Sequence, residues 1–285
     1  MNTTVKYSYF PGCSMKTSAK ENNASLKVLF HKLGIALIEL DDWSCCGSSS
    51  AHSINTGLSI DMASRNIAIA PADRPLMVAC PSCTLRLKQT HLHIKESEEL
   101  QERFYELWGK EFNKDLQIVH FFEVMETIGQ NKHCNTDIIK KPLTGLKFVP
   151  YYGCMLARPP EMRHNPNYYG LMENILQSLG AEAVDWGHHS KCCGTFLSVA
   201  KPEAITPIIN EIIQAGIDAG GDCIVTACSM CQLNLEIRCD LKKQIPTMHF
   251  TELISLALGT KQYKRWFSKH LVDPTNLLEG LGLIP

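Results

Sequence analysis

The segments WSCCGSSS at residues 43–50 and SKCCGTFL at residues 190–197 each place two adjacent cysteines directly before a glycine. The side chains of adjacent cysteines are too close and too badly aimed to form a disulfide with each other in the usual geometry. Two thiols at one point of the chain therefore indicate a purpose other than a local disulfide, and the surrounding cysteines indicate which one.

These surrounding cysteines repeat as a set. In each half of the chain one cysteine precedes the CCG triplet and a CxxC pair follows it. The first cysteine set is Cys13, Cys45, Cys46, Cys80 and Cys83, and the second cysteine set is Cys154, Cys192, Cys193, Cys228 and Cys231. Only Cys134, Cys223 and Cys239 stand outside the two sets.

The flanking residues repeat in the same order. VKYSYFPGC (5–13) resembles LKFVPYYGC (146–154), LFHKLGIALIELDDWSCCG (29–47) resembles ILQSLGAEAVDWGHHSKCCG (175–194), and LMVACPSCTLRL (76–87) resembles IVTACSMCQLNL (224–235). Three similar segments in one order indicate a duplicated domain. We place the boundary near Gly145, after a polar segment at 129–145, which gives domains 1–145 and 146–285.

Residue patterns predict the same secondary structure in both halves. The expected order is strand (6–10; 147–151), helix ending in Leu-Gly (24–33; 171–179), strand (36–40; 183–186), helix (58–70; 204–215) and strand (76–79; 223–226). A charged helical stretch is expected at about 95–110. Alternating strands and helices predict an α/β fold with two homologous, Rossmann-like parallel-sheet halves. Ligands gather beyond the carboxyl ends of such strands, where the cysteines lie, so each set should converge on one spot.

Composition narrows the class of protein. The length of 285 residues predicts about two domains. The 28 Lys and Arg balance 29 Asp and Glu without a long basic run, so no nucleic-acid partner is expected. No apolar stretch approaches the roughly 18 residues of a membrane span, and the N-terminus lacks a signal pattern. We therefore expect a cytoplasmic protein, in which 13 cysteines stay reduced for metal, cluster or thiol chemistry.

Three uses of the cysteines compete on pattern alone. Structural zinc takes four ligands, which leaves one thiol over in each set. A thioredoxin-like redox pair would explain CPSC at 80–83 but neither CCG triplet. An iron–sulfur cluster bound by thiolates suits both the number and the arrangement, and we favour it.

Two complete copies of Cys, CCG and CxxC resemble the cysteine-rich CCG domain family, and specifically the B-type subunit of heterodisulfide reductase and its bacterial relatives. The resemblance covers nearly the whole chain. It implies that the first and second cysteine sets each bind one noncubane 4Fe-4S cluster, with the two halves facing each other across a pseudo-two-fold axis. It also implies an oxidoreductase of sulfur metabolism that reduces or forms a disulfide or related sulfur bond, with each cluster supplying one of the two electrons.

The same resemblance implies partners. The chain has neither a ferredoxin cysteine run nor a G-x-G-x-x-G flavin motif, so electrons should come through a separate ferredoxin-like subunit and a separate flavin-bearing subunit. The implied substrate is a disulfide or a lipoate-bound sulfur. The alternative is a non-catalytic electron-transfer or docking subunit of a quinone-linked dehydrogenase of the lactate, glycerol-phosphate or fumarate/succinate type.

Four polar residues are candidate catalytic groups. His188, His189 and Lys191 precede the second CCG triplet and are candidates to donate protons or bind an anionic substrate. Arg158 follows Cys154 and is a candidate to pair with a carboxylate or phosphate. The competing interpretation gives these side chains structural hydrogen bonds or surface salt bridges.

Overall fold

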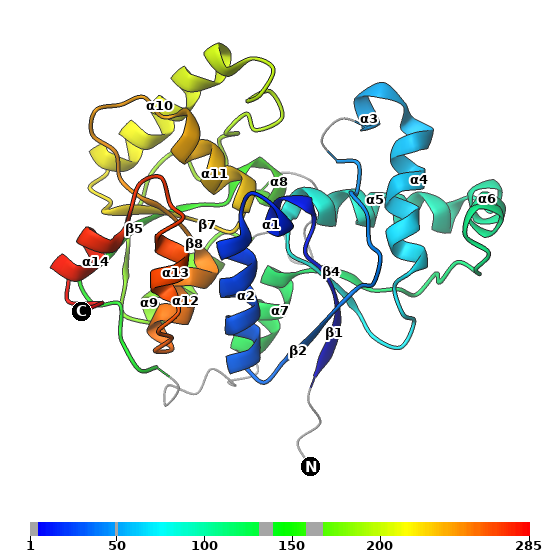
Figure 1. Cartoon of the computed structure of the whole chain (residues 1–285), viewed down its shortest axis with the longest axis horizontal. Helices are drawn as coiled ribbons and strands as arrows, with labels where there is room; N and C mark the ends of the chain where they lie inside the picture. Colours follow the sequence, from blue (N-terminus) through cyan, green and yellow to red (C-terminus); the bar gives the residue numbers. More distant parts are fainter. Residues whose placement is uncertain (1–4, 49–50, 131–138, 158–167) are drawn as a thin grey trace.

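The computed structural model describes residues 5–48, 51–130, 139–157 and 168–285, which form two four-stranded parallel sheets flanked by helices (Figure 1). The first sheet has the order β2-β1-β3-β4 and the second the order β6-β5-β7-β8. The strands are β1 (Lys6–Phe10), β2 (Ala36–Glu39), β3 (Leu76–Val78), β4 (Ile118–His120), β5 (Lys147–Tyr151), β6 (Glu182–Ala183), β7 (Cys223–Thr226) and β8 (Thr247–His249). The same strand order in both sheets confirms the predicted α/β fold with two similar halves.

The predicted helices are present with shifted ends, and the structure adds several helices that were not predicted. The strand predicted at 183–186 is shorter, because only Glu182 and Ala183 pair with β5. Those of the first half are α1 (Cys13–Lys16), α2 (Lys20–Lys32), α3 (Ala51–Ile54), α4 (Thr56–Ala68), α5 (Pro81–Glu96), α6 (Glu98–Trp108) and α7 (Phe121–Gln130). Those of the second half are α8 (Gly153–Ala157), α9 (Leu171–Ser178), α10 (Pro202–Asp218), α11 (Ser229–Arg238), α12 (Phe250–Ala257), α13 (Tyr263–Phe267) and α14 (Thr275–Gly280). The charged stretch at 95–110 is divided at Ser97, whose hydroxyl accepts from Leu100 N and starts α6. The three-residue strands β4 and β8 were not predicted, because such short runs have no clear period.

The two halves share one hydrophobic core. Tyr9 and Met77 of the first sheet lie in the same buried cluster as Phe148 and Val225 of the second. Helix α2 packs against α12 and α13 from the other half, as Figure 1 shows near its centre. The segment that ends the chain belongs to this core, since Leu278 is fully buried. Gly145 lies between the two sheets, but the halves pack as one body.

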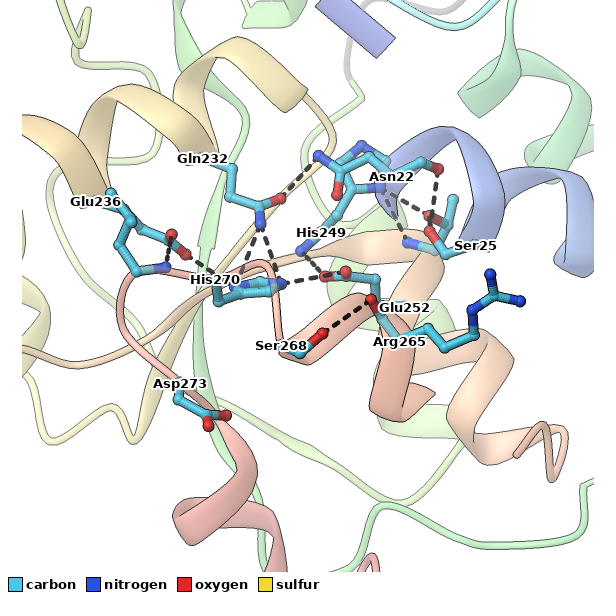
Figure 2. Close-up of polar contacts among 12 residues, drawn as sticks. Asn22, Ser25, Gln232, Glu236, His249, Glu252, Arg265, Ser268, His270 and Asp273 are labelled. Atoms are coloured by element: carbon cyan, nitrogen blue, oxygen red, sulfur yellow. Dashed lines mark hydrogen bonds and ion pairs between the residues drawn. The ribbon is translucent and has the colours of Figure 1, made fainter. Parts of the chain in front are cut away.

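A buried polar network also joins the halves (Figure 2). His270, from the segment after α13, places Nδ1 2.8 Å from Glu236 Oε1 and Nε2 3.2 Å from Glu252 Oε1. Gln232 accepts a hydrogen bond from Asn22 Nδ2 at 2.9 Å, which links α11 to α2 of the first half. Burial alone lowers the pKa of His270, but the charge of Glu252 and the bond to Glu236 outweigh burial and raise it to about 11. His270 is therefore an imidazolium between two buried carboxylates.

The residues after β4 and β8 form a repeated cap that the sequence patterns above did not include. His120 N donates to Glu123 Oε1 at 3.0 Å, and His249 N donates to Glu252 Oε2 at 2.8 Å. Each histidine Nδ1 accepts from the main-chain N–H two residues later, at 3.3 and 3.4 Å. The signal was present in the sequence as HFFE (120–123) and HFTE (249–252), a fourth repeated segment.

Replacing His270 with leucine leaves Glu236 and Glu252 buried without their cation. Removing one partner of a buried ion pair costs about 3–5 kcal/mol, so we expect the His270→Leu variant to lose that much free energy of unfolding in urea at pH 7. The matched control is His93→Leu, because His93 is exposed on α5 and should change the same quantity by less than about 0.5 kcal/mol.

The loss should also depend on pH. Because the native pKa of His270 is raised from 6.5 to about 11, the stability it contributes is complete below pH 6.5 and is lost as the pH rises through about 11. The difference in unfolding free energy between wild type and His270→Leu should therefore shrink over that range. A difference that stays constant would show that His270 acts through packing alone.

Candidate functional site

The cysteines of both sets lie just past the carboxyl ends of their strands. Cys13 follows β1 and Cys80 follows β3, and these two strands are neighbours in the first sheet. Cys154 and Cys228 follow β5 and β7 in the same way. In a parallel sheet with this strand order, the crevice between the first and third strands is the place where connections diverge and ligands bind. The fold therefore brings both cysteine sets to a ligand-binding edge.

All ten cysteines of the two sets line a single cavity of about 270 Å³. The cavity lies between the halves, and its wall also contains Met155, Phe196, Val199 and Met230. Phe196 and Val199 belong to the stretch after the second CCG triplet and are exposed, at 44% and 89%. Phe196 and Val199 therefore form an apolar lip of the cavity on the side of the second half, while Ser48 is the described residue of the first CCG stretch that follows its glycine and lines the cavity.

Within each set the sulfur atoms are crowded. Cys46 Sγ lies 3.0 Å from Cys83 Sγ, and Cys193 Sγ lies 3.5 Å from Cys231 Sγ. Both pairs connect a CCG triplet to the second cysteine of a CxxC pair. The four thiols are buried, so they are held beside each other in the wall of the cavity with little exposure to solvent.

A glycine before the first cysteine of each set makes room for these sulfurs. Gly12 and Gly153 have φ of +79° and +68°, values that L side chains rarely adopt. A Cβ on Gly12 would lie 3.2 Å from Cys83 Sγ, and a Cβ on Gly153 would lie 3.2 Å from Cys231 Sγ. Both glycines are thus required by the backbone conformation and by the neighbouring sulfur.

Crowding separates the pKa values of neighbouring thiols. A hydrogen bond from Cys13 lowers the pKa of Cys45 to about 2, and one from Cys231 lowers the pKa of Cys193 to about 7. The donating thiols, Cys13 and Cys231, have raised pKa values, chiefly because of the same hydrogen bonds. Each set therefore contains thiols that lose their protons readily, and the thiolate is the form that binds metal.

The donor atoms suit a centre with several metal ions. The lining residues in the described ranges include no carboxylate and no imidazole, and thiolates prefer zinc, copper(I) or iron–sulfur clusters. Among the described residues no three His, Cys, Asp or Glu side chains are arranged as ligands of one metal ion. Five thiols also exceed the four that a structural zinc ion takes. The set fits an iron–sulfur cluster better than a single ion.

The candidate catalytic residues have other contacts. Glu211 on α10 pairs with Lys191 Nζ and lies 3.2 Å from His188 Nε2, and neither side chain lines the cavity. The main-chain oxygen of His189 accepts from the N–H groups of Tyr152 and Gly153 at 2.9 and 3.0 Å. This loop therefore ties the second CCG triplet to the turn of Cys154. Arg158 lies outside the described residues, and the catalytic role of all four stays a prediction.

Tyr152 lines the cavity and was not among the predicted site residues. Its hydroxyl donates to Glu173 Oε2 and accepts from Met172 N, and burial, followed by the charge of Glu173, raises its pKa. The sequence holds no local signal for this role, because Glu173 lies on α9 and meets Tyr152 only in the folded chain. Among the described lining residues, Tyr152 is the one titratable side chain that is not a cysteine.

The helices of the described ranges are too short or too polar to cross a lipid bilayer.

Comparisons with known proteins identify relatives of both halves. The CCG family, described as cysteine-rich domain, matches residues 7–88 and 148–236, which is more than half of the chain. The 8-methylmenaquinol:fumarate reductase membrane anchor subunit of Wolinella succinogenes is 27% identical over 95% of this chain and 99% of its own length. The B-type subunit of the ferredoxin:CoB-CoM heterodisulfide reductase of Methanosarcina mazei is 27% identical over 89% of each chain. An Archaeoglobus profundus protein, named as similar to the B-type subunit of heterodisulfide reductase, is 28% identical over 90% of this chain and 91% of its own.

One solved structure shares the fold. The crystal structure of a hypothetical protein from Helicobacter pylori superposes with a TM-score of 0.74 at 14% identity. The match covers 95% of this chain and 53% of that chain, so this chain spans about half the length of that protein. At this identity the likeness supports the fold alone.

Alanine at Gly12 or Gly153 should disturb the site more than alanine at an equally strained but open glycine. Gly34 is the matched control, because it has φ +73° and no atom within 4 Å of an added Cβ. We expect all three variants to lose about 1 kcal/mol of unfolding free energy from backbone strain. Gly12→Ala and Gly153→Ala should lose more in the same urea titration, since each also displaces a cysteine sulfur. Equal losses in all three would contradict this role.

Proposed function

The chain belongs to the family of cysteine-rich CCG domains, and from this we propose that it is the catalytic iron–sulfur subunit of a heterodisulfide reductase-like complex. The proposed reaction is the reduction, or in reverse the formation, of a disulfide or related sulfur bond. The observation that carries the proposal is the single cavity that both cysteine sets line. Two one-electron sites that open on the same space suit a bond whose cleavage takes two electrons.

The proposed ligands are the five thiolates of the first cysteine set for one 4Fe-4S cluster and those of the second set for the other, both of the noncubane type. When bound, such clusters supply single electrons at potentials set by their charge, hydrogen bonds and exposure. The lowered pKa of Cys45, caused chiefly by the hydrogen bond from Cys13, supports this use, because the thiolate is the form that binds metal.

The remaining wall of the cavity would hold the substrate. Met155, Phe196, Val199 and Met230 give this wall an apolar surface, which favours an uncharged, apolar group beside the sulfur atoms. Tyr152 lines the same cavity, and its hydroxyl donates to Glu173 Oε2. His188, His189, Lys191 and Arg158 stay weaker candidates, since the described members of this group do not line the cavity.

The proposed partners are a ferredoxin-like subunit and a flavin-bearing subunit, which would deliver electrons to the first or second cysteine set. Relatives in Methanosarcina mazei and Archaeoglobus profundus are named as one subunit of heterodisulfide reductase or as like it, which supports a protein that works in a complex. The proposed compartment is the cytoplasm, where the free thiols stay reduced.

A second candidate function is an electron-transfer or docking subunit of a quinol-linked fumarate reductase. The observation that favours it is the match to the Wolinella succinogenes protein, which extends over 99% of that protein. The apolar lip at Phe196 and Val199 would suit a quinol ring as well as a disulfide.

Iron and acid-labile sulfide should be present in the protein when it is purified without oxygen. We expect about two clusters' worth of iron in the wild type and about half of it after Cys231→Ser, because only the second set loses a ligand. Cys239→Ser is the matched control, since Cys239 lies outside both sets and does not line the cavity. Zinc in place of iron would contradict the proposal.

The two candidate functions differ in what they turn over. With reduced methyl viologen as donor, the disulfide reductase should reduce a lipoyl disulfide, and Cys193→Ser should abolish that reaction. The electron-transfer subunit should show no such activity. When it is added to its partner proteins, the resulting complex should instead reduce fumarate with a quinol as the electron donor.

A further inference from the structure

The two cysteine sets are closely matched in their immediate surroundings. Each has one exposed thiol, Cys13 or Cys192, one half-buried thiol, Cys45 or Cys154, and three buried thiols. A glycine N–H lies near a CCG sulfur in both, at 3.5 Å for Cys45 and at 3.4 Å for Cys192. Exposure and main-chain hydrogen bonds therefore give no reason for two bound clusters to differ in reduction potential.

The buried charges behind the two sets do differ. Lys88 follows Cys83 on α5 and lies 2.7 Å from Glu123 of the repeated cap. The position that corresponds to Lys88 in the second half is occupied by Glu236 on α11, and the residue that corresponds to Glu123 is Glu252. The first half thus has a buried ion pair where the second half has two buried carboxylates.

The C-terminal segment partly compensates this difference. His270 lies between Glu236 and Glu252 and replaces the missing lysine with an imidazolium. One positive charge against two negative charges still leaves one negative charge in excess. The pKa of Glu21 is raised, chiefly by burial and further by the negative charges of Glu252 and Glu236, so this carboxyl group lies near both of them. The surroundings of the second cysteine set are therefore more negative than those of the first.

We propose that the two sites are unequal in reduction potential, and that an electron settles first at the first cysteine set. Negative charge nearby opposes the addition of an electron, so the second set has the lower potential. Each site takes up one electron from the one-electron donor of the complex, and no bond is made or broken in this step. The inference rests on the proposed function, because it requires a cluster in each set.

Other nearby charges leave the difference in place. Each half has one further half-buried cation, Arg86 on α5 in the first and Arg238 on α11 in the second, where it donates to Ser198 Oγ at 2.8 Å, so these two add equally to both sides. Lys191 and Glu211 near the second set are partly exposed and form a pair, so their effects are screened by solvent and offset each other. Lys88 and Glu123 have 13% and 5% exposed side chains, and Glu236 and Glu252 have 4% and 0%. Buried charges of this kind act at longer range than surface charges, because little water screens them.

The test is a potentiometric titration of the full chain, loaded with iron and sulfide and followed by electron paramagnetic resonance. The wild type should show two separate one-electron steps. Cys83→Ser should abolish the upper step and Cys231→Ser the lower one, which assigns each step to its set. Glu236→Gln removes a negative charge and should raise the reduction potential of the step assigned to the second set. Lys88→Met removes a positive charge and should lower the reduction potential of the step assigned to the first set.

The controls are Lys95→Met and Glu203→Gln, since both residues are exposed and should shift neither step. If Glu236→Gln or Lys88→Met fails to fold, His270→Gln gives the opposite test. Loss of the imidazolium should lower the reduction potential of the second set and widen the difference between the two potentials. A single two-electron step, or equal shifts of both steps in Glu236→Gln, would overturn the inference while leaving the proposed function intact. Protein that binds no iron would overturn both.

Discussion

Crowding of thiols around one cavity is the constraint to which the rest of the fold responds. Cys46 and Cys83 lie with their sulfur atoms 3.0 Å apart, and as thiolates they repel each other. The chain brings them together by ending parallel strands at the same sheet edge. Gly12 and Gly153 then let the backbone approach the sulfurs, because neither has a Cβ to prevent it. The shared core between the sheets holds the two edges face to face.

The duplicated halves have kept their strand order but not their charges. The cap after β4 is closed by Lys88, whereas the cap after β8 needs His270 from beyond the repeat. The C-terminal segment is thus a structural part of the second half and not an appendage. The same asymmetry appears at the cavity mouth, where Phe196 and Val199 are on the second half alone. One half is better suited to accept an electron and the other to contact an apolar ligand.

The sequence predicted what depends on short-range pattern, and it missed what depends on distant contacts. The strands at 6–10, 147–151 and 223–226 have the predicted ends, because each is an apolar run that leads into a cysteine motif. Strands β4 and β8 are too short for a pattern. Tyr152 and Glu173 come together only through packing of α9. His188 and Lys191 suggested catalysis by their place beside a CCG triplet, but that place cannot show that both side chains turn toward Glu211.

The position of His270 after Glu236 and Glu252 in the chain has a consequence for synthesis. Glu236 and Glu252 are synthesised before His270, so during synthesis both carboxylates are present without the imidazolium that pairs with them. Burial of two like charges is unfavourable until the segment after α13 supplies its imidazolium. Helices α11 and α12 can therefore settle into their native packing only after His270 has been synthesised.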